Sequence, residues 1–133
     1  MGAGQFSDQI CRIWQSELYT HLEHAILYAD NAEGHHYDGG SHRAKIYLDL
    51  VGSRSKIADI LVDCIESRLQ DIRQMKDIYD PGNEDDIPYI DELQRAQASI
   101  AMILRRARKV SAQIRSLYST TETLLHPPER TTL

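Results

Sequence analysis

Residues that interrupt helices are scarce in this sequence. Its 133 residues include only four prolines and seven glycines, and most of these fall within residues 34–40 and 81–88. An all-β sandwich or barrel needs turn residues at short, regular intervals along the chain. Their scarcity argues against a loop-rich fold and favours a few long regular elements.

Cysteines and long apolar runs are scarce as well. The two cysteines, Cys11 and Cys64, fall on apolar helical faces, which favours two buried, reduced thiols over a disulfide. No stretch approaches the roughly 18 apolar residues that span a bilayer, and the first residues lack the basic and apolar regions of a signal peptide. We therefore expect a cytoplasmic protein that has no membrane partner.

What the sequence does contain is helical periodicity along almost its whole length. A first helix is predicted from an N-cap at Ser7 to residues 30–33, where Gly34 begins a run of helix breakers. A second helix is predicted from an N-cap at Ser41 to about Tyr79.

The middle of the second helix leaves two alternatives open. Gly52 costs roughly 1 kcal/mol relative to alanine in a helix interior, and Ser53 or Ser55 could start a new helix. Either the helix is single and kinked at Gly52, or it splits in two. Arg54 and Arg68 fall near its apolar stripe; we interpret them as lying at its margin, with a polar contact across an oligomer interface as the alternative.

The third helix has the most regular pattern. It follows an acidic turn at residues 80–88, in which Pro88 suits a first helical turn, and it ends before Pro127 and Pro128. Its apolar residues recur at alternating steps of four and three, which is typical of a coiled-coil seam. The seam that we expect to pack the core or to bind a partner consists of Tyr89, Leu93, Ile100, Ile103, Val110, Ile114 and Leu117.

The predicted fold class is all-α: an elongated antiparallel bundle of three long helices, or four if the second breaks at Gly52. It would occupy residues 1–126, followed by a flexible tail over residues 127–133. Helices of nearly 40 residues would be roughly 55–60 Å long, whereas a first helix of about 25 residues covers roughly 35–40 Å. Because part of the apolar seam would then lack a partner within the chain, we expect another protein or a second copy to cover it.

The net charge of −5 conceals an uneven distribution. Residues 93–121 hold six of the fifteen basic residues and none of the twenty acidic ones. Their outward face forms a basic ridge of Arg105, Arg108, Lys109 and Arg115. This ridge could bind nucleic acid or an acidic protein, or it could pair with second-helix acids such as Asp59, Asp63 and Glu66. The acidic balance of the whole chain argues against general affinity for DNA.

Histidines are concentrated in one part of the chain, five of the six lying between His21 and His42. Imidazole groups bind zinc, so the candidate metal ligands are His21, His24, His35, His36 and His42. A di-iron bundle would need inward-facing Glu-x-x-His pairs on two helices. The one such pair, Glu33 with His36, falls in a predicted loop, so the alternative is a solvated connector between two helices.

These observations predict function by class only. The sequence lacks a phosphate-binding glycine loop and a dinucleotide-binding fingerprint, and we expect no cofactor. Our first hypothesis is a non-enzymatic helical adaptor or regulatory subunit that self-associates or docks on a partner protein through helical seams. The alternatives are a nucleic-acid-binding accessory subunit that uses the basic ridge and a metal-dependent helical-bundle enzyme that uses the histidines.

Overall fold

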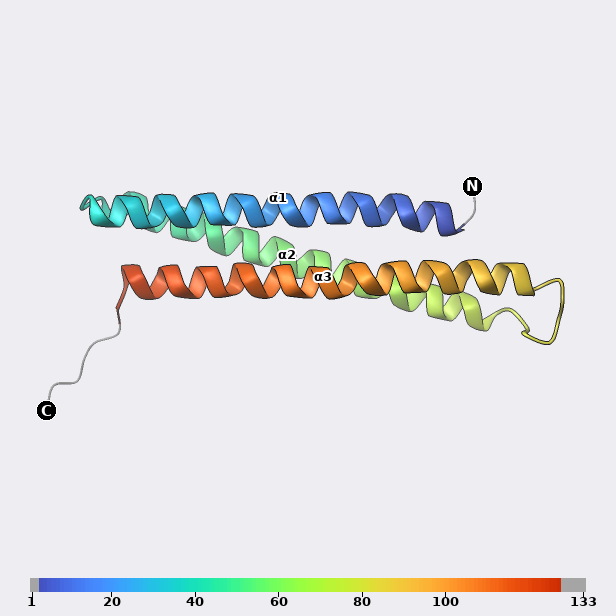
Figure 1. Cartoon of the computed structure of the whole chain (residues 1–133). Helices are drawn as coiled ribbons and strands as arrows, with labels where there is room; N and C mark the ends of the chain where they lie inside the picture. The colour runs from blue at the N-terminus through green and yellow to red at the C-terminus, as the bar shows by residue number, and fades with distance from the viewer. Residues whose placement is uncertain (1–2, 128–133) are drawn as a thin grey trace, which may run out of the picture.

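The structure is a computed structural model that describes residues 3–127, with side chains described from residue 8 onward. Within this range the chain forms no strand and three helices: α1 (Ala3–Tyr37), α2 (Ser41–Asp77) and α3 (Ile87–Leu125). Figure 1 shows the helices running side by side in alternating directions, so the predicted all-α antiparallel bundle is confirmed. Residues 128–133 of the predicted tail lie outside the described range.

The first helix is longer than the sequence predicted. α1 begins at Ala3, four residues before the predicted cap at Ser7, and it continues through Gly34. A glycine inside a helix costs about 1 kcal/mol relative to alanine. Beyond this glycine, however, α1 is held against α2, because His35 stacks on Tyr47 with ring centroids 5.4 Å apart. Packing between helices therefore overrides the local signal for a helix end.

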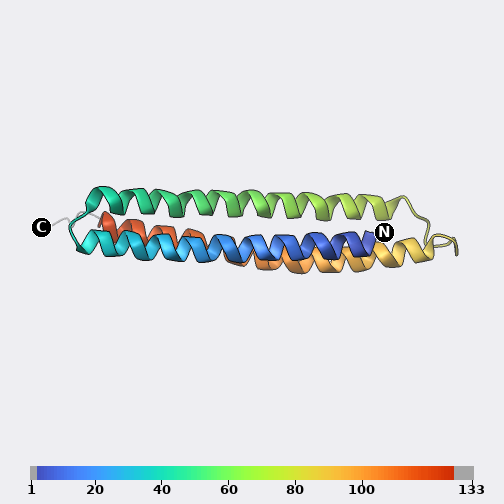
Figure 2. The same ribbon diagram turned by 90° about the horizontal axis from the view of Figure 1, so that it is seen from above.

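The three helices are nearly equal in length, with 35, 37 and 39 residues. The predicted mismatch between a short first helix and two long ones is therefore wrong, and it no longer argues for a partner. Figures 1 and 2 show that only the end of the α2–α3 hairpin extends past the N-terminal end of α1.

Both connections use residues that suit tight turns. Gly39 has a φ of +82°, a left-handed conformation that glycine adopts without strain after a helix. The N-cap of α2 is Gly40 and not the predicted Ser41, and no side chain caps this helix by a hydrogen bond. In the α2–α3 turn, the Asp80 carboxylate accepts a hydrogen bond from the backbone N–H of Gly82 at 2.8 Å.

The core is one column of buried side chains between the helices. Each helix packs against both of the others. The largest fully buried side chains come from all three helices: Leu18, Val51, Ile65, Ile100 and Ile114. The predicted seam of α3 lies in this column, buried at Leu93, Ile100, Ile103, Val110 and Ile114 and half-buried at Leu117. Tyr89 lies at the margin, 55% exposed, and stacks on Tyr79 with ring centroids 5.4 Å apart. The seam therefore packs against α1 and α2 of the same chain.

The second helix is unbroken at Gly52, so the four-helix alternative is wrong. A Cβ atom at this position would lie 3.1 Å from Cε2 of Tyr118 on α3, closer than an ordinary carbon–carbon contact of about 3.5–4.0 Å. The glycine therefore lets the tyrosine ring lie against the backbone of α2.

Candidate interaction surfaces

Polar and charged contacts line the groove between α2 and α3. Glu66 pairs with Arg108, with Oε1 and Nη2 2.5 Å apart, and Asp59 pairs with Arg115 at 3.0 Å. The hydroxyl of Ser111, a residue that is only 3% exposed, donates a hydrogen bond to the same Asp59 oxygen. Two of the four residues of the basic ridge thus pair with acids of α2, as the ion-pairing interpretation expected.

The other two residues of the basic ridge, Arg105 and Lys109, are exposed. Neither forms an ion pair with any residue in the described range. Arg106 donates a hydrogen bond to Oε1 of Gln15 on α1 at 2.7 Å. The ridge therefore offers two unpaired cations rather than four, which weakens the attraction expected for a phosphate backbone.

On the other side of α2, Arg54 joins this helix to α1. Its Nη1 lies 2.9 Å from Nδ1 of His21, and its guanidinium lies 6.0 Å from the centroid of the Tyr28 ring. Because a guanidinium only donates hydrogen bonds, Nδ1 of His21 is the acceptor in this contact. Burial and the charge of Arg54 lower the pKa of His21 below its usual 6.5, against an opposing effect of Glu17. Arg54 thus lies at the stripe margin, as predicted, with its contacts inside the chain.

The other candidate metal ligands have separate surroundings. His24 packs on Tyr28 of α1 and His35 packs on Tyr47 of α2, with ring centroids 6.0 and 5.4 Å apart. His36 packs on its neighbour Tyr37, and His42 is exposed at the start of α2. Among the described residues, no three histidine, cysteine, aspartate or glutamate side chains come together where they could hold a metal ion. The fold therefore does not bring the five histidines to one point.

Both cysteines are free thiols, but only one is buried. Burial, and to a lesser extent nearby Asp8, raises the pKa of the Cys11 thiol. Cys64 is exposed, which contradicts the prediction of two buried thiols. It lies beside Trp14 and Ile60, on the surface that α1 and α2 share.

A second row of apolar side chains runs along α2, outside the buried core. Ile46, Leu50, Ile57 and Ile60 are 46%, 37%, 40% and 61% exposed. Their spacing of four, seven and three residues keeps them on one side of the helix. This side is distinct from the row of fully buried residues that packs inside the bundle.

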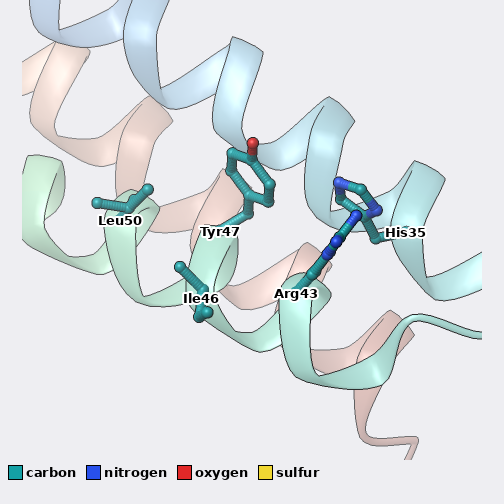
Figure 3. A pocket seen from close by; sticks show the side chains of 5 residues that line it. All are labelled: His35, Arg43, Ile46, Tyr47 and Leu50. Atoms are coloured by element: carbon teal, nitrogen blue, oxygen red, sulfur yellow. The ribbon is translucent and has the colours of Figure 1, made fainter.

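An open hollow of about 360 Å³ shows that the first part of this row borders α1. It is lined by Ile46 and Leu50 together with Arg43, Tyr47 and His35. In Figure 3, Arg43 and Tyr47 reach from α2 towards His35 on α1, and the two aliphatic side chains lie further along the helix.

A second open hollow, of about 540 Å³, borders the other part of the row. Here Ile60 lies opposite Ile10 and Trp14 of α1. Ile13 is 57% exposed and Leu27 55% exposed; Ile13 follows Ile10 by three residues, and Leu27 lies two heptads further on the same side. We call the combined surface the α1/α2 face, which consists of Ile10, Ile13, Trp14, Leu27, Ile46, Leu50, Ile57 and Ile60.

Sequence reasoning assigned the α3 seam correctly to one face but missed the α1/α2 face. The sequence did contain a signal for this face, because α2 carries aliphatic residues on two sides. Leu50 and Ile57 repeat at a heptad spacing beside the stripe that forms the core. A helix that buries only one side needs only one such stripe.

No family model, curated protein or solved structure matches this chain. Among the described residues, none of the helices combines the length and apolar character required to cross a membrane. Function is therefore inferred from the chain's own surfaces.

Proposed function

We propose that this chain is a non-enzymatic helical adaptor or regulatory subunit that binds another helical polypeptide, a partner protein or its own copy, across the α1/α2 face. One observation carries the proposal: exposed aliphatic side chains border the α1/α2 groove on both sides of the Arg54–His21 contact, whereas polar contacts of the Glu66–Arg108 type line the α2/α3 groove. Exposed apolar side chains gathered on one side of a protein are typical of an interaction site.

The size of the face sets what a partner must offer. Burying one exposed aliphatic side chain contributes about 1.5–3 kcal/mol, and six of the eight side chains, all but Ile10 and Trp14, are 37–61% exposed. Covering these six would therefore contribute about 6 kcal/mol. Because association costs about 4–15 kcal/mol, the partner must bring an apolar stripe of its own. An amphipathic helix meets this requirement, since it would complete a four-helix arrangement with α1 and α2.

Site-specific photo-crosslinking in cells that make the protein tests the proposal. A benzophenone side chain is placed at Ile60 in the face or, as a control, at the exposed Ala112 on α3. We expect a discrete protein adduct from position 60 and none from position 112. Equal adducts from both positions, or none from position 60, would contradict docking at this face.

A further inference from the structure

We propose that the contact between Arg54 and His21 is an acid-sensitive latch, which holds α1 against α2 at neutral pH and releases α1 when His21 takes up a proton. The two side chains join the middle of α1 to the middle of α2. Among the described residues, His21 belongs to no group of three possible metal ligands. The latch operates within one chain, whichever partner that chain binds.

The hydrogen bond at the latch depends on the protonation state of His21. Nη1 of Arg54 lies 2.9 Å from Nδ1 of His21, and a guanidinium has no acceptor. A protonated imidazole carries N–H donors on both ring nitrogens, so its Nδ1 can no longer accept from Arg54. Protonation therefore breaks this bond and leaves two positive charges side by side between the helices.

The charged groups around His21 come from α1 and α2. Burial lowers the pKa of His21 most, and the charges of Arg54 on α2 and His24 on α1 lower it further. Glu17 on α1 opposes them, and within the described chain α3 adds no charge to this balance. The closed bundle thus binds this proton less readily than a chain with α1 released, so acidification through the ordinary pKa of 6.5 favours release.

A second imidazole adds to the response. The Tyr28 ring lies 6.0 Å from the His24 ring, measured between centroids, and its centroid lies 6.0 Å from the guanidinium of Arg54. Nδ1 of His24 is buried and has no hydrogen-bond partner among the described residues. A proton on His24 would therefore place a third positive charge beside the same tyrosine, and an N–H at Nδ1 would be buried without an acceptor.

Carboxylates and arginines, rather than histidines, form the ion pairs that join α2 to α3. Glu66 pairs with Arg108, and Asp59 pairs with Arg115. Carboxylates ordinarily lose their charge only below about pH 5, so acidification from pH 7.5 to about 5.5 leaves such pairs in place. The response to acid is therefore specific for the contact that holds α1.

Release of α1 would also divide the α1/α2 face. Four of its eight residues, namely Ile10, Ile13, Trp14 and Leu27, lie on α1, and the other four lie on α2. A partner bound across both helices would therefore be released by acid. This consequence rests on the proposed function, whereas the latch itself does not.

The two native cysteines report the release of α1 in the full recombinant chain. Cys11 on α1 is 9% exposed, whereas Cys64 on α2 is exposed. Both thiols are labelled with 4,4′-dithiodipyridine at neutral and acidic pH, each site is read by mass spectrometry, and the rate at Cys11 is divided by the rate at Cys64. We expect this ratio to rise by about three- to ten-fold between pH 7.5 and about 5.5, the range for the loss of one hydrogen bond.

Substitutions at the latch test its chemistry. His21→Gln offers Arg54 a carbonyl acceptor that does not titrate, so the ratio should change by less than about two-fold between the two pH values. Arg54→Gln removes the neighbouring charge and should also reduce the response. His42→Gln is the matched control, because His42 is exposed at the start of α2; it should respond as the unmodified chain does. Far-UV circular dichroism establishes that each variant is folded.

A cysteine placed between α2 and α3 distinguishes release of α1 from unfolding of the whole bundle. Ser111 is 3% exposed and donates a hydrogen bond to Asp59 of α2. In Ser111→Cys, the labelling rate at position 111 relative to Cys64 should stay within about two-fold between the two pH values. A parallel rise at positions 11 and 111 would mean global unfolding and would overturn the latch.

Two other results would also overturn it. One is a Cys11 ratio that does not change with pH in the unmodified chain. The other is a rise that His21→Gln and Arg54→Gln both leave intact. Because the photo-crosslink from position 60 is measured at neutral pH, these results leave the proposed function standing, and the absence of that crosslink leaves the latch standing.

Discussion

Replacing Gly52 by alanine would test why α2 remains unbroken at its least helix-forming interior residue. The new Cβ atom would lie 3.1 Å from Cε2 and 3.5 Å from Cδ2 of Tyr118. Gly34 in α1 is the matched control, because a Cβ atom there has no neighbour within 4 Å. If close packing of the tyrosine ring is the reason for Gly52, the effect of the substitution must depend on Tyr118.

The two contributions to the free energy of unfolding have opposite signs. Alanine is favoured over glycine in a helix interior by about 1 kcal/mol. With Tyr118 present, the ring must retreat by several tenths of an ångström, and overpacking of this kind costs about 1–3 kcal/mol. Gly52→Ala should therefore be neutral or destabilising by up to about 2 kcal/mol in the unmodified chain and stabilising by about 1 kcal/mol in the Tyr118→Ala background.

Urea unfolding of the unmodified chain, Gly52→Ala, Tyr118→Ala and the double variant, followed by circular dichroism, gives the coupling free energy between the two positions. We expect about 1–3 kcal/mol between Gly52→Ala and Tyr118→Ala. Gly34→Ala should instead stabilise both backgrounds equally, by up to about 1 kcal/mol. A coupling below about 0.5 kcal/mol for Gly52 would refute the packing explanation, because independent sites add within that margin.

Three further predictions concern the histidine, the basic ridge and the core. The pKa of His21 is lower in the folded chain than its usual 6.5. The free energy of unfolding, measured between pH 7.5 and about 5.5, should therefore fall as the pH is lowered, and His21→Gln should make it depend less on pH. Any binding of duplex DNA at low salt should rest on Arg105 and Lys109, so reversing both charges should abolish retention in a filter-binding assay. Ile65 is 0% exposed. Ile65→Ala should lower the free energy of unfolding, measured by urea denaturation, by about 2–5 kcal/mol.

The all-α class and the α3 seam were predictable because both depend on local periodicity. Residues such as Ile100 and Ile114 repeat at heptad spacing, and only one side of α3 can bury them together. Pro88 likewise marked the first turn of α3 correctly, because proline lacks the N–H that a helix start leaves unpaired.

The ends of α1 were not predictable from local signals. Gly34 indicated a helix end, but Ala32 is fully buried and His35 stacks on a tyrosine of α2. Contacts between residues distant in sequence therefore decided the outcome, as tertiary packing commonly does over propensity.

The candidate sites depend on helix rotation, which a sequence does not specify when two apolar rows compete. α2 carries one row around Ile65 and another around Ile57, and either could have faced the core. The rotation that buries Ile65 exposes Cys64 and aims Arg54 at His21, 33 residues away. Histidines that are close in sequence then make separate contacts, His21 with Arg54 and His35 with Tyr47, and no three possible metal ligands come together among the described residues.

The small buried side chains of α1 have a consequence for how the bundle opens. In its second half α1 buries Ala25, Ala29 and Ala32, whereas the second half of α2 buries Leu61, Ile65, Leu69 and Ile72. Alanine allows close approach of two helices but removes little apolar surface from water. Ion pairs, in addition, join α2 to α3. We therefore expect detachment of α1 from the bundle to need less free energy than separation of α2 from α3, so that the α2–α3 hairpin stays folded longest.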